Sequence, residues 1–119
     1  MTDLVDRSCA ACRAGAPQAT PQEIARYLPQ LPGWRTTEVA GSKCLEKSFT
    51  RKNFAQALAL TNRIGAIAEQ QDHHPAIVTE WGKVTVAWWT HAIAGLHLND
   101  FIMAAKTERL VVAGEPVAK

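Results

Sequence analysis

Residues 69–91, EQQDHHPAIVTEWGKVTVAWWTH, contain the change of pattern that decides the fold. A long helical pattern ends here, because a residue before proline disfavours helix, so the chain leaves the helix at His74-Pro75. Two segments follow, residues 77–81 and 83–90, on either side of Gly82. In the second segment, Val84, Val86 and Trp88 alternate with Thr85, Ala87 and Trp89. This alternation predicts a β-hairpin with one strongly apolar face.

The preceding part of the chain has the same order of a helix followed by two strands. Thr20 and Pro21 are typical of a helix start, and apolar spacing predicts a short helix over residues 21–28. Strands are expected over residues 34–39 and 43–49, joined by a turn. A longer helix is expected from about residue 51 to residue 71. A last helix is expected from about residue 98, before the helix-ending Gly114 and Pro116.

This order, helix-strand-strand-helix-strand-strand-helix, predicts an α+β fold. Short hairpins imply antiparallel pairing, so we expect a four-stranded antiparallel sheet with three helices packed on one face. The other face would stay partly open, and Trp89 on it would favour self-association. Lys47 interrupts the apolar alternation of the second strand, and Thr50 is a candidate cap for the long helix. The apolar stripe of that helix is Phe54, Leu58, Leu60, Ile64, Ile67 and Ala68.

Length and charge exclude several classes of protein. The chain has 119 residues, of which 47% are hydrophobic, and its formal net charge is +2. One domain is expected over residues 21–114, with a flexible extension over 1–20 and a short tail over 115–119. So small a charge gives no reason to expect nucleic acid or an anionic membrane as a partner. The first residues do not form a secretory signal, so the expected location is the cytoplasm.

Three cysteines, an odd number, make a poor disulfide framework. Cys9 and Cys12 form a CxxC, but Cys44 is a distant single thiol and no second ligand pair follows. A structural zinc site needs four ligands, so we expect no metal. A zinc protein that combines these thiols with histidines remains an alternative that metal analysis would test.

The densest group of titratable side chains is Glu69, Asp72, His73 and His74. Glu69 and His73 would share a helix face if the helix extends that far. A carboxylate beside an imidazole suits acid–base chemistry near neutral pH, whereas the alternative is a solvated helix end with a favourable dipole. His91 is expected at the end of a strand, where the alternative is a half-buried histidine of the sheet.

Four blocks in order carry a resemblance to a known family. They are Glu69–Pro75 with its His-His-Pro, Trp81–Val86, Thr90-His91, and Gly95-Leu96 followed by Asp100. Together they resemble the pterin-4a-carbinolamine dehydratase family over most of residues 21–112. The Thr-Glu-Trp-Gly-Lys and Trp-Trp segments resemble the bacterial type that accompanies phenylalanine hydroxylase.

The resemblance implies an enzyme, 4a-hydroxytetrahydrobiopterin dehydratase, that converts a 4a-hydroxytetrahydropterin to the quinonoid dihydropterin. It implies no metal or organic cofactor, a homodimer or homotetramer, and phenylalanine hydroxylase as a possible partner. His73 and His74 would be the proton-transfer pair and His91 a partner of the substrate hydroxyl or ring, with Glu69 and Asp100 orienting the histidines. The residues expected to bind the pterin are Asp72, His73, His74, Pro75, Trp89, Thr90, His91 and Ala92.

The competing class is a non-catalytic binding module. Animal relatives in the family also act as dimerisation partners of a transcription factor. A bacterial member could similarly act as a regulatory partner of phenylalanine hydroxylase or of a transcription factor. Removal of the three histidines separates the two classes, because only the enzyme needs them.

Overall fold

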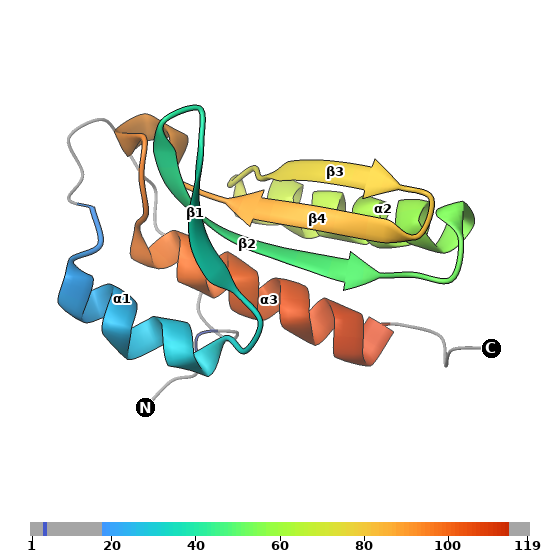
Figure 1. Ribbon diagram of the computed structural model, residues 1–119, viewed down its shortest axis with the longest axis horizontal. Coiled ribbons are helices and arrows are strands. Elements are labelled where there is room, and N and C mark those ends of the chain that lie inside the picture. Colours follow the sequence, from blue (N-terminus) through green and yellow to red (C-terminus); the bar gives the residue numbers. More distant parts are fainter. Residues whose placement is uncertain (1–3, 5–17, 115–119) are drawn as a thin grey trace.

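The computed structural model describes Leu4 and residues 18–114, with side chains as far as Val111. Its sheet has four strands in the order β1-β2-β4-β3, and every neighbouring pair is antiparallel. Figure 1 shows the sheet with its helices. The α+β prediction is confirmed. The elements in chain order are α1 (Pro21–Tyr27), η2 (Leu28–Gln30), β1 (Arg35–Val39), β2 (Ser42–Thr50), α2 (Phe54–Gln71), β3 (Ala76–Glu80), β4 (Lys83–Trp88), η3 (His91–Ile93) and α3 (Leu98–Gly114).

One apolar core joins the helices to one face of the sheet. The alternating set predicted for β4 forms its centre, since Val84, Val86 and Trp88 are fully buried. Leu45 of β2 lies opposite Trp88, so both side chains point to this core. From the helices, the same core receives Leu60, Ile64, Phe101 and Ile102. No helix in the described part of the chain has the length and apolarity needed to cross a membrane.

The long helix α2 begins later than the sequence predicts. The set of its apolar side chains that is buried in the core is also smaller than predicted. The predicted cap, Thr50, is wrong. The N-cap is Asn53, whose side chain accepts a hydrogen bond from the Gln56 amide. The Arg51 amide donates to the Gly82 carbonyl in the β3–β4 turn, and a bend at residues 52–53 leads into the helix. Two residues of the predicted stripe, Phe54 and Leu58, are 47% and 43% exposed. The buried residues of α2 are Ala57, Leu60, Ile64 and Ala68.

Lys47 interrupts the apolar alternation of β2, and α3 explains why a charge is tolerated there. Its ammonium group pairs with Glu108 of α3 and donates to the Pro32 carbonyl at 3.1 Å. Glu108 also accepts from the Trp34 indole at 2.8 Å. A partly buried charge is tolerated where it is paired and hydrogen-bonded, so Lys47 does not disrupt the strand.

Three residues before Pro21 contact the domain. Leu4 is 4% exposed and belongs to the core. The Gln18 side-chain amide donates to the Ile93 carbonyl at 3.0 Å, and the Ala19 amide donates to the Leu96 carbonyl at 2.7 Å. The predicted limits of the domain stay a prediction, but these contacts join its predicted extension to the loop after β4. The rest of that extension, including Cys9 and Cys12, and the predicted tail lie outside the described residues.

The face of the sheet away from the helices is polar along much of its length. Ser48 and Thr85 share a hydrogen bond on it, and Arg35 pairs with Glu46 at 2.6 Å. Apolar side chains interrupt this polar surface, since Cys44 and Ala87 are buried there and Val78 is 54% exposed. Burial, with the negative charges of Glu46 and Asp100, raises the pKa of the Cys44 thiol above its ordinary value of 9.0.

The raised pKa of Cys44 predicts a loss of stability in alkali. Above pH 9.0 the unfolded chain releases the thiol proton while the folded chain retains it, so the free energy of unfolding falls as pH rises. Cys44→Ala removes this contribution and leaves the other two thiols unchanged. Urea unfolding across the alkaline range should therefore show a steeper decline for the unmodified protein than for Cys44→Ala. Parallel curves would contradict the prediction.

Candidate active site

The turn after α2 gives His73 and His74 different surroundings. Asp72 ends the helix with a left-handed conformation (φ 52°), and the His73 amide donates to the Ala68 carbonyl at 3.0 Å. His73 is then buried, with 8% of its surface exposed, whereas the His74 side chain is 51% exposed. Because the helix ends at Gln71, Glu69 and His73 do not share a helix face. The condition under which these two side chains would share a face is therefore not met, and Glu69 contacts His74 instead.

A buried carboxylate holds His73. Asp100 is fully buried at the start of α3, and its Oδ1 lies 2.7 Å from Nε2 of His73. Its Oδ2 accepts from the Thr90 hydroxyl at 2.8 Å and from the His97 amide at 2.9 Å. A buried carboxylate is tolerated where such donors surround it. Asp100 therefore connects the turn after α2, the end of β4 and the start of α3.

Glu69 contacts the second histidine. Its Oε1 lies 2.6 Å from Nε2 of His74, and the Glu69 side chain is 79% exposed. An exposed pair of this kind orients a side chain but contributes little to stability. His73 and His74 thus each have a carboxylate on Nε2, one pair buried and the other in solvent.

His91 lies beside His74 through a turn that the sequence does not predict. β4 ends at Trp88, and Thr90 forms a bridge with Gly95 that encloses η3. His91 begins this turn and does not end a strand. Its Nε2 donates to the His74 carbonyl at 3.0 Å, and its ring lies 4.5 Å from the Trp89 ring. The turn therefore brings the third histidine to the His-His-Pro segment.

The three histidines share one feature of hydrogen bonding. A carbonyl oxygen and ionised carboxylates only accept, so the Nε2 atoms of His73, His74 and His91 donate to them. A neutral imidazole carries one proton, so each Nδ1 then has a free lone pair. No group among the described residues bonds these Nδ1 atoms. Each Nδ1 can accept a proton, or donate one when the ring is charged.

The other predicted site residues lie next to the histidines in the chain. Asp72 and Ala92 are exposed, and Pro75 and Trp89 are half-buried. Thr90 is 1% exposed and directs its hydroxyl to Asp100. His97 is not among the site residues predicted from the sequence, yet its amide donates to Asp100 and its Nδ1 accepts from the Asn99 amide at 3.1 Å. The position of His97 three residues before an acid, at a helix start, was the available indication.

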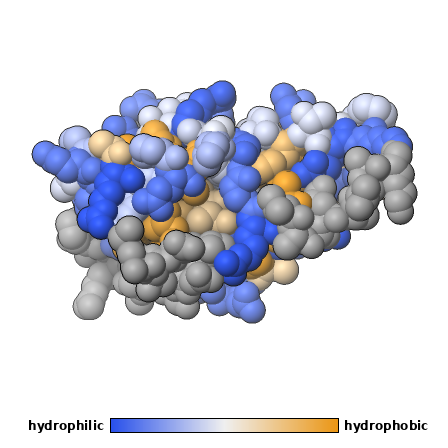
Figure 2. Space-filling view, turned by 90° about the horizontal axis from the view of Figure 1, so that it is seen from below, coloured by the Kyte–Doolittle hydropathy of each residue, from blue (hydrophilic) through white to orange (hydrophobic). Residues whose placement is uncertain are grey.

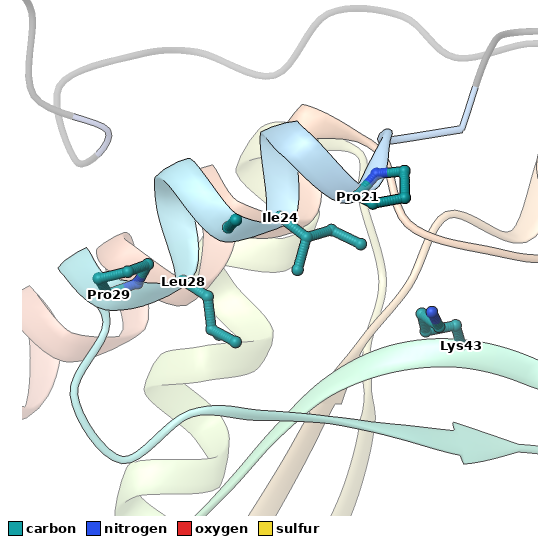
Figure 3. Close-up of a pocket in the computed structure, with 6 residues that line it drawn as sticks. Pro21, Ile24, Leu28, Pro29 and Lys43 are labelled. Carbon is teal, nitrogen blue, oxygen red and sulfur yellow. The ribbon is translucent and has the colours of Figure 1, made fainter.

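The structure also has a groove that does not include the histidines. It has a volume of about 510 Å³ and lies between α1 and β2. Figure 3 shows Ile24 of α1 and Leu28 of η2 directed into it, with Lys43 on the other side. Figure 2 views the molecule from below and shows that polar side chains separate the apolar ones on this face.

Within the described residues, no three histidine, cysteine or acidic side chains form a group that could hold a metal ion.

Comparison with known proteins identifies the family. The family model described as pterin 4 alpha carbinolamine dehydratase matches residues 17–110, which include every histidine of the site. This chain belongs to that family. The match begins one residue before Gln18, so it includes the contacts of Gln18 and Ala19 with the loop after β4.

Individual relatives agree with this assignment. A protein of Syntrophotalea carbinolica, provisionally named pterin-4-alpha-carbinolamine dehydratase, is 53% identical over 111 residues, covering 93% of this chain and 99% of its own. A similarly named protein of Gloeobacter violaceus is 52% identical over 108 residues, covering 91% of this chain and 93% of its own. A crystal structure described as transcriptional coactivator/pterin dehydratase from Brucella melitensis is 30% identical, with a TM-score of 0.70, and covers 79% of this chain and 98% of its own.

The buried position of Asp100 predicts a large effect on stability. Asp100→Ala leaves the His73, Thr90 and His97 donors without their acceptor, and each orphaned donor costs about 1–3 kcal/mol. We expect the free energy of unfolding to fall by more than about 3 kcal/mol. Asp100→Asn should destabilise less, because one oxygen remains.

Urea unfolding measures both effects against a matched control. Glu69→Gln is the same change of carboxylate to amide at an exposed histidine partner, and it should alter the free energy of unfolding by less than about 0.5 kcal/mol. Equal losses in Asp100→Asn and Glu69→Gln would contradict the view that the Asp100 carboxylate supports the fold.

Proposed function

We propose that this protein dehydrates a 4a-hydroxytetrahydropterin to the quinonoid dihydropterin by histidine acid–base catalysis. The observation that carries the proposal is the grouping of three imidazoles, one buried on Asp100 and two exposed, in a chain of this family. The fold brings these groups together from two separate segments, the turn after α2 and the turn after β4. The exposed surfaces of His74 and His91 leave room for a substrate beside buried His73.

The reaction needs one proton donor and one proton acceptor. The C4a–O bond breaks, and the hydroxyl leaves as water after taking a proton from an acid. The N5–H bond loses its proton to a base as the C4a=N5 double bond forms. The two proton transfers balance, so the enzyme returns to its starting state after exchange with water. Imidazoles suit both roles because they gain and lose protons near neutral pH.

His73 and His74 are the proposed proton-transfer pair, and His91 contacts the substrate hydroxyl or ring. The Nδ1 atoms are the working nitrogens, because each Nε2 is already bonded. Glu69 and Asp100 orient the first two imidazoles. Asp72, Pro75, Trp89 and Ala92 are proposed to contact the flat pterin. Thr90 acts on the reaction through Asp100, since its hydroxyl is bonded to that carboxylate.

The biological role we propose is recycling of the pterin cofactor in aromatic amino acid hydroxylation. The reaction uses no metal or organic cofactor, because proton transfer alone completes it. Phenylalanine hydroxylase, which produces the carbinolamine, is the proposed physiological partner.

A second candidate function is a binding or regulatory partner of phenylalanine hydroxylase or of a transcription factor. The Brucella melitensis structure is described as a transcriptional coactivator as well as a dehydratase. On this chain, Phe54 and Leu58 of α2 and Trp81 of the β3–β4 turn are exposed apolar side chains. Such side chains at a surface favour association with another protein.

Replacing the histidines distinguishes the two functions. If His73 and His74 act in proton transfer, His73→Ala and His74→Ala should each reduce turnover about 100-fold or more. The double variant should lose far less than the product of the two losses, because groups that act as a unit are not additive. His91→Ala should also weaken substrate binding, and Glu69→Gln should have a smaller effect.

The assay generates the carbinolamine with phenylalanine hydroxylase and follows its ultraviolet absorbance after subtraction of the uncatalysed rate. Trp81→Phe, at an exposed position outside the site, is the control and should retain full turnover. Folded His73→Ala and His74→Ala variants that bind pterin and keep full activity would favour the binding module.

The open sheet face and exposed α2 side chains also predict a homo-oligomer, either a dimer or a tetramer. Trp89 is half-buried on the helix-free side, and Val78 on the same side is 54% exposed. Large apolar side chains stabilise interfaces when association buries them. Light scattering at micromolar concentration should give at least twice the 13.0 kDa of one chain. A 13.0 kDa particle alone would contradict this prediction.

A further inference from the structure

Trp88 stacks on the buried histidine. The Trp88 indole and the His73 imidazole are 5.9 Å apart between ring centroids, and their planes differ by only 6°. Trp88 is fully buried, so this contact lies in the core beneath the site. The indole is fixed in turn, because its Nε1 donates to the Thr107 hydroxyl at 3.2 Å and that hydroxyl donates to the Met103 carbonyl at 2.7 Å.

The same helix fixes both rings. Asp100 binds the edge of the imidazole, and Thr107 binds the edge of the indole. These two residues are seven apart on α3, two helical turns along one face. A change in the position of α3 would therefore move both contacts of His73 together.

The parallel arrangement is unlike the other aromatic contacts of the described chain. Tyr27 with Phe101 is inclined at 43°, Trp34 with Phe49 at 68°, and Trp89 with His91 at 36°. Inclined and offset parallel arrangements are both favourable for aromatic pairs, and of these four contacts only that of His73 is parallel. The 6° angle at a centroid separation of 5.9 Å describes an offset parallel contact, in which the indole lies flat against part of the imidazole face.

We propose that Trp88 is a positioning residue for His73, an inference that rests on the proposed dehydration. The hydrogen bond to Asp100 positions Nε2, and rotation of the ring about its Cβ–Cγ bond is the remaining motion that would turn Nδ1. The flat indole removes this rotation, because a turned ring would lose the contact or collide with it. Nδ1 is then held in one direction, and such orientation determines the rate of a positioned proton transfer.

Three substitutions separate positioning from simple packing. Trp88→Leu keeps an apolar side chain but removes the flat face, and Trp88→Met is a second variant of this kind with a flexible side chain. Trp88→Phe keeps a flat face. We expect kcat above background to fall at least tenfold in the first two and less than threefold in Trp88→Phe. The KM for the pterin should stay within twofold in all three, because Trp88 does not contact the substrate. Trp81→Leu, at a 71% exposed position, is the matched control and should leave both constants unchanged.

Nuclear magnetic resonance tests the arrangement without catalysis. In the unmodified protein, the indole ring current should shift the His73 ring C–H protons upfield, and the Nε2–H form should be seen in the 15N spectrum. Trp88→Leu and Trp88→Met should lose the upfield shift but keep the Nε2–H form that Asp100 holds. A folded Trp88→Leu or Trp88→Met variant with unchanged kcat would overturn the inference.

The spectra also separate this inference from the proposed function. Absence of dehydration by the unmodified protein, with the upfield shift present and lost in Trp88→Leu, would reject the function and support the positioning of the His73 ring. Absence of the upfield shift in an active unmodified protein would reject the positioning and support the function. If Trp88→Leu does not fold, Trp88→Met and Trp88→Phe provide the same comparison of variants without and with a flat side chain.

Discussion

The buried carboxylate of Asp100 is the interaction on which the site depends. A carboxylate taken out of water is tolerated only with donors around it, and here the donors come from three different segments. They are the His73 imidazole after α2, the Thr90 hydroxyl after β4 and the His97 amide before α3. These segments meet only if the hairpin and both long helices are packed together. The packing that forms the core therefore also brings the residues of the site together.

The sequence predicted the elements of this fold well because each depends on local patterns. The alternation of Val84, Val86 and Trp88 is a direct consequence of a strand with one buried face, and these three side chains are fully buried. His74-Pro75 indicated the exit from α2 for an equally local reason, the conformational restriction before proline. The site residues named from spacing and resemblance also lie close to one another along the chain or across β4.

The pairing of the histidines could not be predicted from spacing. A separation of four residues favoured Glu69 with His73, but the left-handed Asp72 ends the helix and reverses the direction of the chain. The actual partner of His73 lies 27 residues away, and only tertiary packing brings it there. Lys47 is a similar case. Its charge is tolerated in β2 because it pairs with Glu108 of α3, which lies 61 residues away in the chain. Asp100 lies in the first turn of α3, where the helix dipole favours an acid, and the packing of α3 adds its contact with His73.

The three imidazoles differ in freedom, and this difference follows from the order of the elements. His73 directly follows the end of a packed helix and points to the core, so its Nε2 is bonded to Asp100 and part of its face lies against the Trp88 indole. His74 is one residue further and lies in solvent, held by an exposed carboxylate. His91 belongs to a short turn whose contact with the His74 carbonyl places it beside the pair. The proposed dehydration would use this difference, because one fixed imidazole would keep one proton-transfer direction constant while the two exposed imidazoles adjust to the bound pterin. The geometry thus assigns the strictest orientation to His73, and the cost of that orientation is met by core packing that the fold requires in any case.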